Sequence, residues 1–225
     1  MKGIALTIDT PNGPVSGLLE HPDNAELLYV LAHGAGAGMR HAFMEDLAAR
    51  LAARGVGTLR YQFPYVEQGK RRVDPPPVAH ATVRAAVAQA RLLAPGLPLL
   101  AGGKSFGGRM TSQAAAEEPL EGVAGLVFLG FPLHAAGRPS ESRAAHLAGV
   151  TVPMLFLQGT RDALADLTLM RKVCHELGDR ATLHVVEGGD HSFKVAKRSG
   201  RSQDEVMVEM AVTVAEWGMR VRGER

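Results

Sequence analysis

The sequence predicts an α/β domain in which a mostly parallel sheet is covered by helices on both faces. The chain has 225 residues, 46% of them hydrophobic, which is enough to bury one substantial core. Its longer apolar runs are continuous rather than alternating, as in strands that are buried on both faces. A helical pattern follows almost every run, and this alternation is typical of a doubly wound sheet. We therefore expect residues 1–225 to form a single domain.

The first part of the chain begins with two predicted strands, Gly3–Asp9 and Val15–Glu20. The turn Pro-Asn-Gly-Pro between them indicates a hairpin-like start. The apolar run ELLYVLAHG predicts a third strand. After it, Phe43, Leu47 and Leu51 recur at helical spacing, so a helix is expected there.

Further strand–helix pairs complete the prediction. They are VGTLRYQF with VAHATVRAAVAQARLLA, LPLLAGG with RMTSQAAAEE, VAGLVFLGF with a short segment around Arg143–Ala148, VPMLFLQG with LADLTLMRKVCHELG, and ATLHVVEGG with a final helix from about Asp204 to Val221. Only about twenty residues separate Phe131 from Val152, which is too few for several helices. No sizeable cap domain is therefore expected.

Composition and charge exclude several classes of protein. With 25 Lys and Arg against 23 Asp and Glu, the chain lacks the charge imbalance of a disordered segment and the basic surplus of a nucleic-acid binder. The single cysteine, Cys174, cannot form an internal disulfide. The N-terminus lacks the apolar region of a signal peptide, and every apolar run is far below the ~20 residues that cross a bilayer. We expect a cytoplasmic protein with no nucleic-acid or membrane partner, and its oligomeric state stays open.

The strongest chemical signal is Gly103-Lys104-Ser105-Phe106-Gly107, between an apolar strand and a helix. A serine on such a sharp turn adopts strained backbone angles, and only glycine fits at the flanking positions. The turn exposes the serine hydroxyl at the carboxyl edge of the sheet, so Ser105 is a candidate nucleophile. An N-cap serine in a glycine-rich connection is the alternative interpretation.

The glycine-rich run from His33 to Gly38 also follows a predicted strand, so it faces the same edge of the sheet as Ser105. Backbone N–H groups of Ala35 and Phe106 could then point at one oxygen. Two such donors form the oxyanion hole that acyl transfer requires.

Nucleotide binding is the alternative use of these loops, and spacing disfavours it. Met39 stands where the third glycine of G-x-G-x-x-G would be. For a Walker-type phosphate loop ending in Gly103-Lys104-Ser105, the required first glycine falls at position 98, which is Pro98.

A nucleophilic serine needs a base, and His191 is the favoured candidate among nine histidines. It lies in Gly188-Gly189-Asp190-His191-Ser192-Phe193, directly after the strand ATLHVVEGG. His184 lies inside that strand and is expected to be structural. The one serious rival is His134, which follows the strand VAGLVFLGF at the same edge.

The acid that orients the base is expected to be Asp162, in LQGTRD just after the penultimate strand. Asp166 is expected to face solvent or to start the next helix, and Asp190 to fix its own loop. Ser105, Asp162 and His191 fall in the order nucleophile, acid, base, each after a successive strand. This joint order, more than any single residue, predicts a triad.

Six residues near this edge are candidates for substrate binding: His33, Gly34, Lys104, Arg60, Tyr61 and His134. For Arg60 and Tyr61, fold support and substrate contact are equally favoured. For Lys104, a solvated surface charge is favoured over contact with an anionic substrate. No metal site is predicted, and no cofactor is implied.

These motifs together resemble those of the α/β-hydrolase family along nearly the whole chain. HGAGAG, GGKSFGG, LQGTRD and GGDHSF correspond to its oxyanion loop, nucleophile elbow, acid loop and histidine loop. A nearer similarity is carried by the segments LRYQFPYVEQGKRRVDPPP and LGFPLHAAGRP. They resemble segments of small bacterial family members that are related to the hydrolase-like domains of testis-expressed protein 30 and of a subunit of the nonspecific-lethal chromatin complex. The resemblance implies an eight-stranded sheet with only the second strand antiparallel, and it assigns Ser105, Asp162 and His191 as the triad.

The sequence thus predicts a serine hydrolase that cleaves an ester, a thioester or a related acyl bond of a small molecule. The natural substrate stays open. The alternative is a non-catalytic binding or scaffold module that keeps the hydrolase shape, since a fold does not by itself fix a function.

Overall fold

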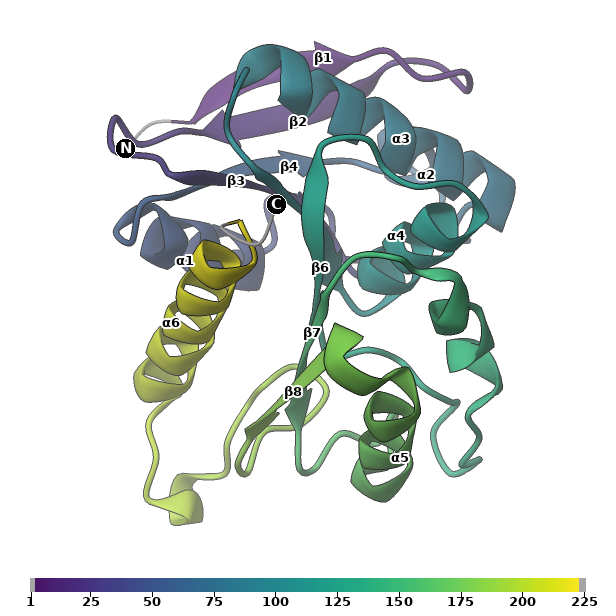
Figure 1. Cartoon of the computed structure of the whole chain (residues 1–225), viewed down its shortest axis with the longest axis vertical. Coiled ribbons are helices and arrows are strands. Elements are labelled where there is room, and N and C mark those ends of the chain that lie inside the picture. Colours follow the sequence, from purple (N-terminus) through teal and green to yellow (C-terminus); the bar gives the residue numbers. More distant parts are fainter. Residues whose placement is uncertain (1–2, 223–225) are drawn as a thin grey trace.

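The computed structural model describes residues 3–222 and is built around one eight-stranded sheet (Figure 1). The strand order is β1-β2-β4-β3-β5-β6-β7-β8. The strands are β1 (Ile4–Ile8), β2 (Val15–Glu20), β3 (Leu27–Ala32), β4 (Val56–Tyr61), β5 (Leu99–Lys104), β6 (Val123–Leu129), β7 (Met154–Gly159) and β8 (Ala181–Val186).

Strand β2 pairs antiparallel with both of its neighbours, β1 and β4, whereas all other pairs in the sheet are parallel. Only β2 therefore runs against the rest, which confirms the expected topology. Parallel strands end at a common edge, so the loops that follow β3, β5, β7 and β8 meet on one side of the molecule.

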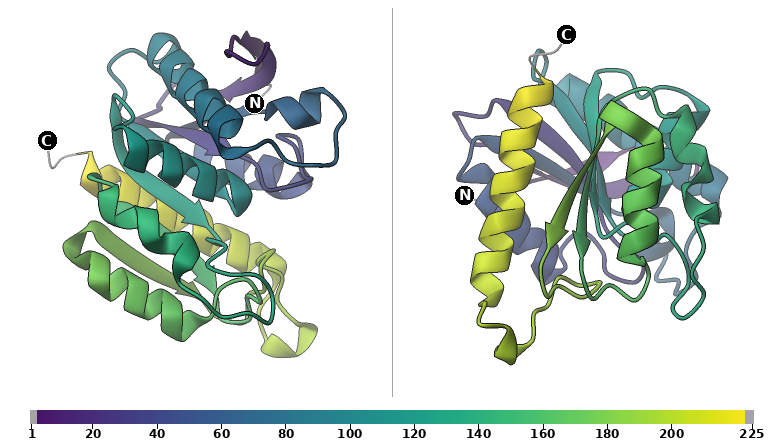
Figure 2. Two further views of the ribbon diagram at one scale, coloured as in Figure 1. Left: turned by 90° about the vertical axis from the view of Figure 1, so that its right-hand side faces the viewer. Right: turned by 60° about the horizontal axis from the view of Figure 1, so that its bottom comes forward.

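The helices form a layer on each face of the sheet. Helices α1 and α6 cover one face and α3, α4 and α5 the other, as the two sides of the sheet in Figures 1 and 2 show. The helical segments are α1 (Ala42–Ala52), α2 (Pro64–Glu67), α3 (Pro76–Leu93), α4 (Phe106–Glu117), η1 (Ser142–Gly149), α5 (Leu167–Leu177), η2 (Gly178–Arg180), η3 (Lys197–Ser199) and α6 (Gln203–Val221).

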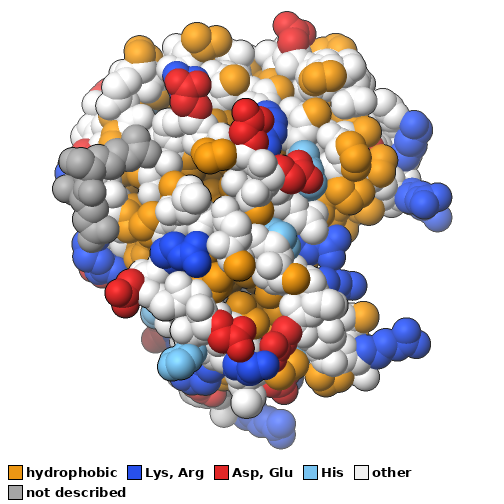
Figure 3. All heavy atoms as spheres, turned by 45° about the vertical axis from the view of Figure 1, so that its right-hand side comes forward, with side chains coloured by type: hydrophobic (Ala, Val, Ile, Leu, Met, Phe, Trp, Pro, Cys, Tyr) orange, Lys and Arg blue, Asp and Glu red, His pale blue; other side chains and the backbone are white. Residues whose placement is uncertain are grey.

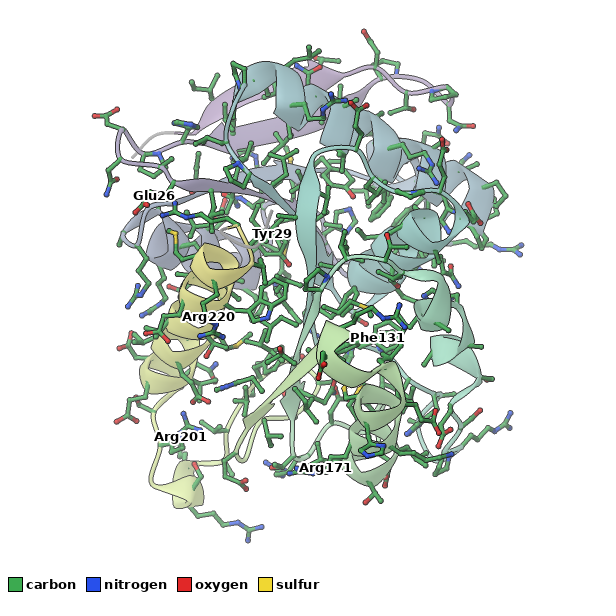
Figure 4. The ribbon with its side chains drawn as sticks, in the orientation of Figure 1. Glu26, Tyr29, Phe131, Arg171, Arg201 and Arg220 are labelled. Carbon is green, nitrogen blue, oxygen red and sulfur yellow. The ribbon has the colours of Figure 1, made fainter. Side chains whose placement is uncertain are left out.

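Each face of the sheet has its own hydrophobic core. Tyr29 lies in the core under α1 and α6, where its hydroxyl donates to the Val127 carbonyl (Figure 4). Phe128 and Phe156 pack against each other in the core on the opposite face, with ring centroids 4.8 Å apart. Burial of the strands on both faces explains why their sequences read as continuous apolar runs.

The connection between β6 and β7 carries only the short 3₁₀ segment η1. No inserted helical domain stands there, which confirms the expected absence of a sizeable cap. Among residues 3–222, no helix is both long enough and apolar enough to cross a membrane.

Candidate active site

Ser105 lies at the turn between β5 and α4 with φ 48° and ψ −111°. Such a conformation is strained for a residue with a side chain, and tight packing around the turn holds it. A Cβ atom on Gly103 would lie 2.1 Å from the Ala32 carbonyl oxygen, and one on Gly107 would lie 2.5 Å from that of His33. Only glycine fits at either position, as the sequence predicted.

The structure brings the three predicted triad residues together. His191 Nε2 lies 2.8 Å from Ser105 Oγ, and His191 Nδ1 lies 2.8 Å from Asp162 Oδ2. Both distances are those of good hydrogen bonds. The imidazole therefore bridges the hydroxyl and the carboxylate, in the geometry by which an oriented base activates a hydroxyl.

The Asp162 carboxylate is held rigidly beneath the imidazole, with a side chain only 1% exposed. Its Oδ1 accepts a hydrogen bond from the Leu164 N–H at 2.8 Å, and its Oδ2 accepts a second one from Gln158 Nε2 at 2.5 Å. Gln158 is a buried residue of β7 that sequence reasoning missed. Its place in an apolar strand does not indicate that its side chain contacts Asp162. These bonds fix the carboxylate that faces His191.

The run from His33 to Gly38 lies against the nucleophile turn. A Cβ atom on Gly34 would lie 3.8 Å from Ser105 Cβ, so the two loops are in contact. Within residues 3–222, neither the Ala35 N–H nor the Phe106 N–H donates a hydrogen bond. Both N–H groups are therefore without a partner in the part of the chain that the structure describes.

This glycine-rich loop is held from behind by buried side chains. His33 is fully buried, with Nδ1 2.8 Å from the Gly34 carbonyl oxygen and Nε2 accepting from the Phe63 N–H. Burial lowers the pKa of His33 to about 4, so its imidazole is neutral near pH 7. Tyr65 adds a hydrogen bond from the Gly36 N–H to its hydroxyl at 2.9 Å.

Arg60 and Tyr61 lie in the interior rather than at the site, with exposures of 1% and 0%. The Arg60 guanidinium pairs with Glu20 and donates to the Met39 carbonyl oxygen. The structure thus favours fold support over substrate contact for both residues, and the same holds for His33. Of the six candidates for substrate binding, Gly34 and Lys104 line the cavity described below.

His134, the rival base, is also a structural residue. Its Nδ1 lies 2.9 Å from the Ala135 carbonyl oxygen, and its Nε2 accepts from the Asp166 N–H. It is buried, with 5% exposure, and does not line the cavity. Asp166 caps helix α5, and Asp190 accepts hydrogen bonds from two backbone N–H groups of its own loop.

Lys104 is not the solvated surface charge that the sequence favoured. Its ammonium donates a hydrogen bond to the His191 carbonyl oxygen and lies 5.3 Å from the centre of the Phe193 ring. Burial lowers the pKa of Lys104 to about 8, and the carboxylates of Asp162 and Asp190 oppose this shift. Lys104 therefore links the nucleophile turn to the histidine loop.

A cavity of about 930 Å³ opens beside Ser105 and His191, between α1, the histidine loop and the start of α6. Its apolar lining includes Phe43, Val195 and Met207. The full lining is Gly34, Ala35, Ala37, His41, Ala42, Phe43, Met44, Asp46, Lys104, Ser105, Leu164, His191, Ser192, Lys194, Val195, Gln203 and Met207. Sequence reasoning missed its helical residues, because no local motif shows that α1 and α6 adjoin the site. Within residues 3–222, no three His, Cys, Asp or Glu side chains gather as metal ligands.

A family model described as an alpha/beta hydrolase domain matches residues 25–219. The chain belongs to this family. The nearer similarity to testis-expressed protein 30 stays a prediction.

Solved structures agree with this family's fold. One is an α/β serine hydrolase without a lid from Xanthomonas campestris (23% identity, 98% of this chain and 94% of that chain covered, TM-score 0.74). A dienelactone hydrolase from Anabaena variabilis is similar as well (20% identity, 97% of each chain covered, TM-score 0.77). A serine hydrolase homologue from Coxiella burnetii matches at 19% identity, with 96% of this chain and 97% of that chain covered and a TM-score of 0.75.

Proposed function

We propose that this α/β-hydrolase family member is an esterase-like serine hydrolase with Ser105, His191 and Asp162 as its triad. The observation that carries the proposal is the pair of 2.8 Å contacts that joins the three side chains through the imidazole. The strained backbone of Ser105 supports the proposal, because residues whose surroundings enforce such strain cluster at active sites.

The reaction begins when His191 Nε2 takes the proton of the Ser105 hydroxyl as its oxygen attacks the acyl carbon. The N–H groups of Ala35 and Phe106 donate to the oxyanion that forms. Asp162 holds the imidazole in place and stabilises its protonated form. His191 then returns the proton to the departing alkoxide, which leaves as the alcohol, and an acyl group remains on Ser105.

Water releases the acyl group by the same steps in a second round. His191 takes a proton from the water as the hydroxide oxygen attacks the acyl carbon, and the Ser105 oxygen leaves with that proton. The products are an alcohol and a carboxylic acid. We place the acyl chain in the cavity beside α1 and α6, because apolar side chains such as Phe43 and Met207 line it.

Replacement of Ser105 by alanine tests the proposal. Ser105→Ala should lower the turnover of p-nitrophenyl butyrate by a factor of about a thousand or more, because it removes the nucleophile. The melting temperature should stay near that of the wild type. Equal turnover in the variant would rule out Ser105 as nucleophile.

A fluorophosphonate probe distinguishes the enzyme from a non-catalytic scaffold. Labelling of the wild type, with loss of the label in Ser105→Ala, requires an activated hydroxyl. A folded wild-type protein that neither takes the label nor cleaves esters would instead favour the binding module.

A further inference from the structure

The nucleophile has a second flank, on the side of α4 and η1, that the triad does not use. A space-filling view from this side shows a hollow in the surface with Lys and Arg side chains at its margins (Figure 3). The apolar cavity lies instead toward α1 and α6. The side of α4 and η1 thus differs in chemistry from the apolar cavity beside α1 and α6.

Arg109 stands one helical turn after Ser105, and its N–H donates to the Ser105 carbonyl oxygen at 3.1 Å. Side chains on a helix lean toward its N-terminus, which for Arg109 is the side of the nucleophile turn. Its Nε atom is buried and has no hydrogen-bond partner. Burial lowers the pKa of Arg109, and repulsion from Arg143 adds to the shift.

Arg143 approaches from the other wall of this flank. It is the second residue of η1, and η1 leads from the carboxyl end of β6 back to the start of β7. The beginning of η1 therefore lies at the same edge of the sheet as Ser105. Packing of η1 on α4 is marked by the contact of Ser112 Oγ with His146 Nε2 at 2.8 Å.

The carboxylates nearest in sequence to these two arginines are engaged elsewhere. Glu117 contacts His80, Glu118 pairs with Arg84, and Glu141 pairs with Lys172. In the part of the chain that the structure describes, neither the Arg109 nor the Arg143 guanidinium has a hydrogen-bond or ion-pair partner. Two like charges close together, one with a buried unpaired N–H, are costly unless an anion joins them.

We propose that Arg109 and Arg143 bind a carboxylate on the alcohol half of the substrate, opposite the apolar cavity. The planar guanidinium group matches a carboxylate with two parallel hydrogen bonds. This inference rests on the proposed function, which places the acyl half in the cavity. The preferred substrates are thus esters that combine an apolar acyl chain with an acidic alcohol.

A matched pair of esters tests the preference: 4-carboxyphenyl butyrate and its uncharged isostere 4-carbamoylphenyl butyrate. The kcat/KM of the wild type should be about tenfold or more higher for the ester that carries the carboxylate. This ratio corresponds to the free energy that a hydrogen bond to a charged group contributes. Arg109→Gln and Arg143→Gln should each reduce this ratio severalfold. Arg171→Gln, at an exposed position of helix α5 (Figure 4), is the matched charge control and should keep this ratio.

A binding measurement separates failure of this inference from failure of the proposed function. Addition of 4-hydroxybenzoate, at constant ionic strength, should raise the melting temperature of the wild type and of Ser105→Ala, but raise that of Arg109→Gln less. Cleavage of both esters at equal efficiency, with no such rise, would overturn the carboxylate site and leave the hydrolase. If Arg109→Gln does not fold, Arg143→Gln decides the same question.

Discussion

His33 shows how a single buried side chain ties stability to the oxyanion loop. Its neutral imidazole contacts the Gly34 carbonyl oxygen on one side and accepts from the Phe63 N–H on the other. A protonated ring could no longer accept the second bond. The residue is therefore a brace for the loop whose Ala35 N–H we assign to the oxyanion hole.

Acid should destabilise the protein through this residue. The pKa of His33 is about 4 in the folded protein against 6.5 for an ordinary histidine, so the unfolded chain binds more protons between these values. The contribution of His33 to the free energy of unfolding is thus fully present above pH 6.5. It is lost as the pH falls toward 4, and the loss from His33 alone is about 3 kcal/mol. His146, with a pKa also near 4, adds to the loss in the same window.

Urea unfolding of His33→Gln at several pH values between 4 and 7 measures the effect. The variant should be less stable than the wild type at pH 7, and the difference should shrink by about 3 kcal/mol toward pH 4. Parallel pH profiles for the two proteins would show that His33 does not titrate in this way.

At the scale of elements, the three residues that we propose as the triad lie on separate loops, and side chains link these loops. Lys104 at the end of β5 holds the histidine loop through the His191 carbonyl oxygen. Phe193 of that loop has a positive φ of 60°, which is rare for an aromatic residue, and its ring stacks on Phe43 of α1. The position of His191 thus depends on contacts with β5 and α1.

Replacement of Lys104 by methionine should lower activity without lowering stability. Loss of the bond to the His191 carbonyl frees the base, so kcat for p-nitrophenyl butyrate should fall by about tenfold with little change in KM. The melting temperature should hold or rise, because the ammonium is buried at a cost. A parallel fall of turnover and melting temperature would instead indicate general structural damage. Lys70→Met, at an exposed loop, is the control.

On the scale of the whole molecule, the fold and the meeting of Ser105, His191 and Asp162 could be predicted, whereas the walls of the site could not. Continuous apolar runs indicate buried parallel strands, and the glycines around Ser105 are required by close backbone contacts. Arg60 is different, because its burial depends on Glu20, which lies 40 residues away in sequence. The cavity wall likewise joins α1 to α6, and no local pattern encodes that meeting.

The cavity between α1 and α6 predicts that kcat/KM increases with the length of the acyl chain until the cavity is filled. Each methylene buried beside Phe43 and Met207 should contribute about 0.8 kcal/mol at most, or roughly fourfold in kcat/KM. A series of p-nitrophenyl esters from acetate upward should therefore rise in kcat/KM and then level off. Met207→Trp, which fills part of the cavity, should move the plateau to shorter chains. A flat series in the wild type would remove the acyl chain from this cavity.

The crowding around Gly102 and Gly103 restricts how this protein can evolve. A Cβ atom at these positions would lie 2.0 Å from the Val127 carbonyl oxygen and 2.1 Å from that of Ala32. Any amino-acid replacement there adds at least a Cβ atom, which would clash with a backbone that cannot move away. These two glycines have no reactive side chain, yet they are among the positions that tolerate mutation least. New substrate preferences can arise instead through the helices and loops that border the cavity, where side chains can be exchanged while the nucleophile turn stays intact.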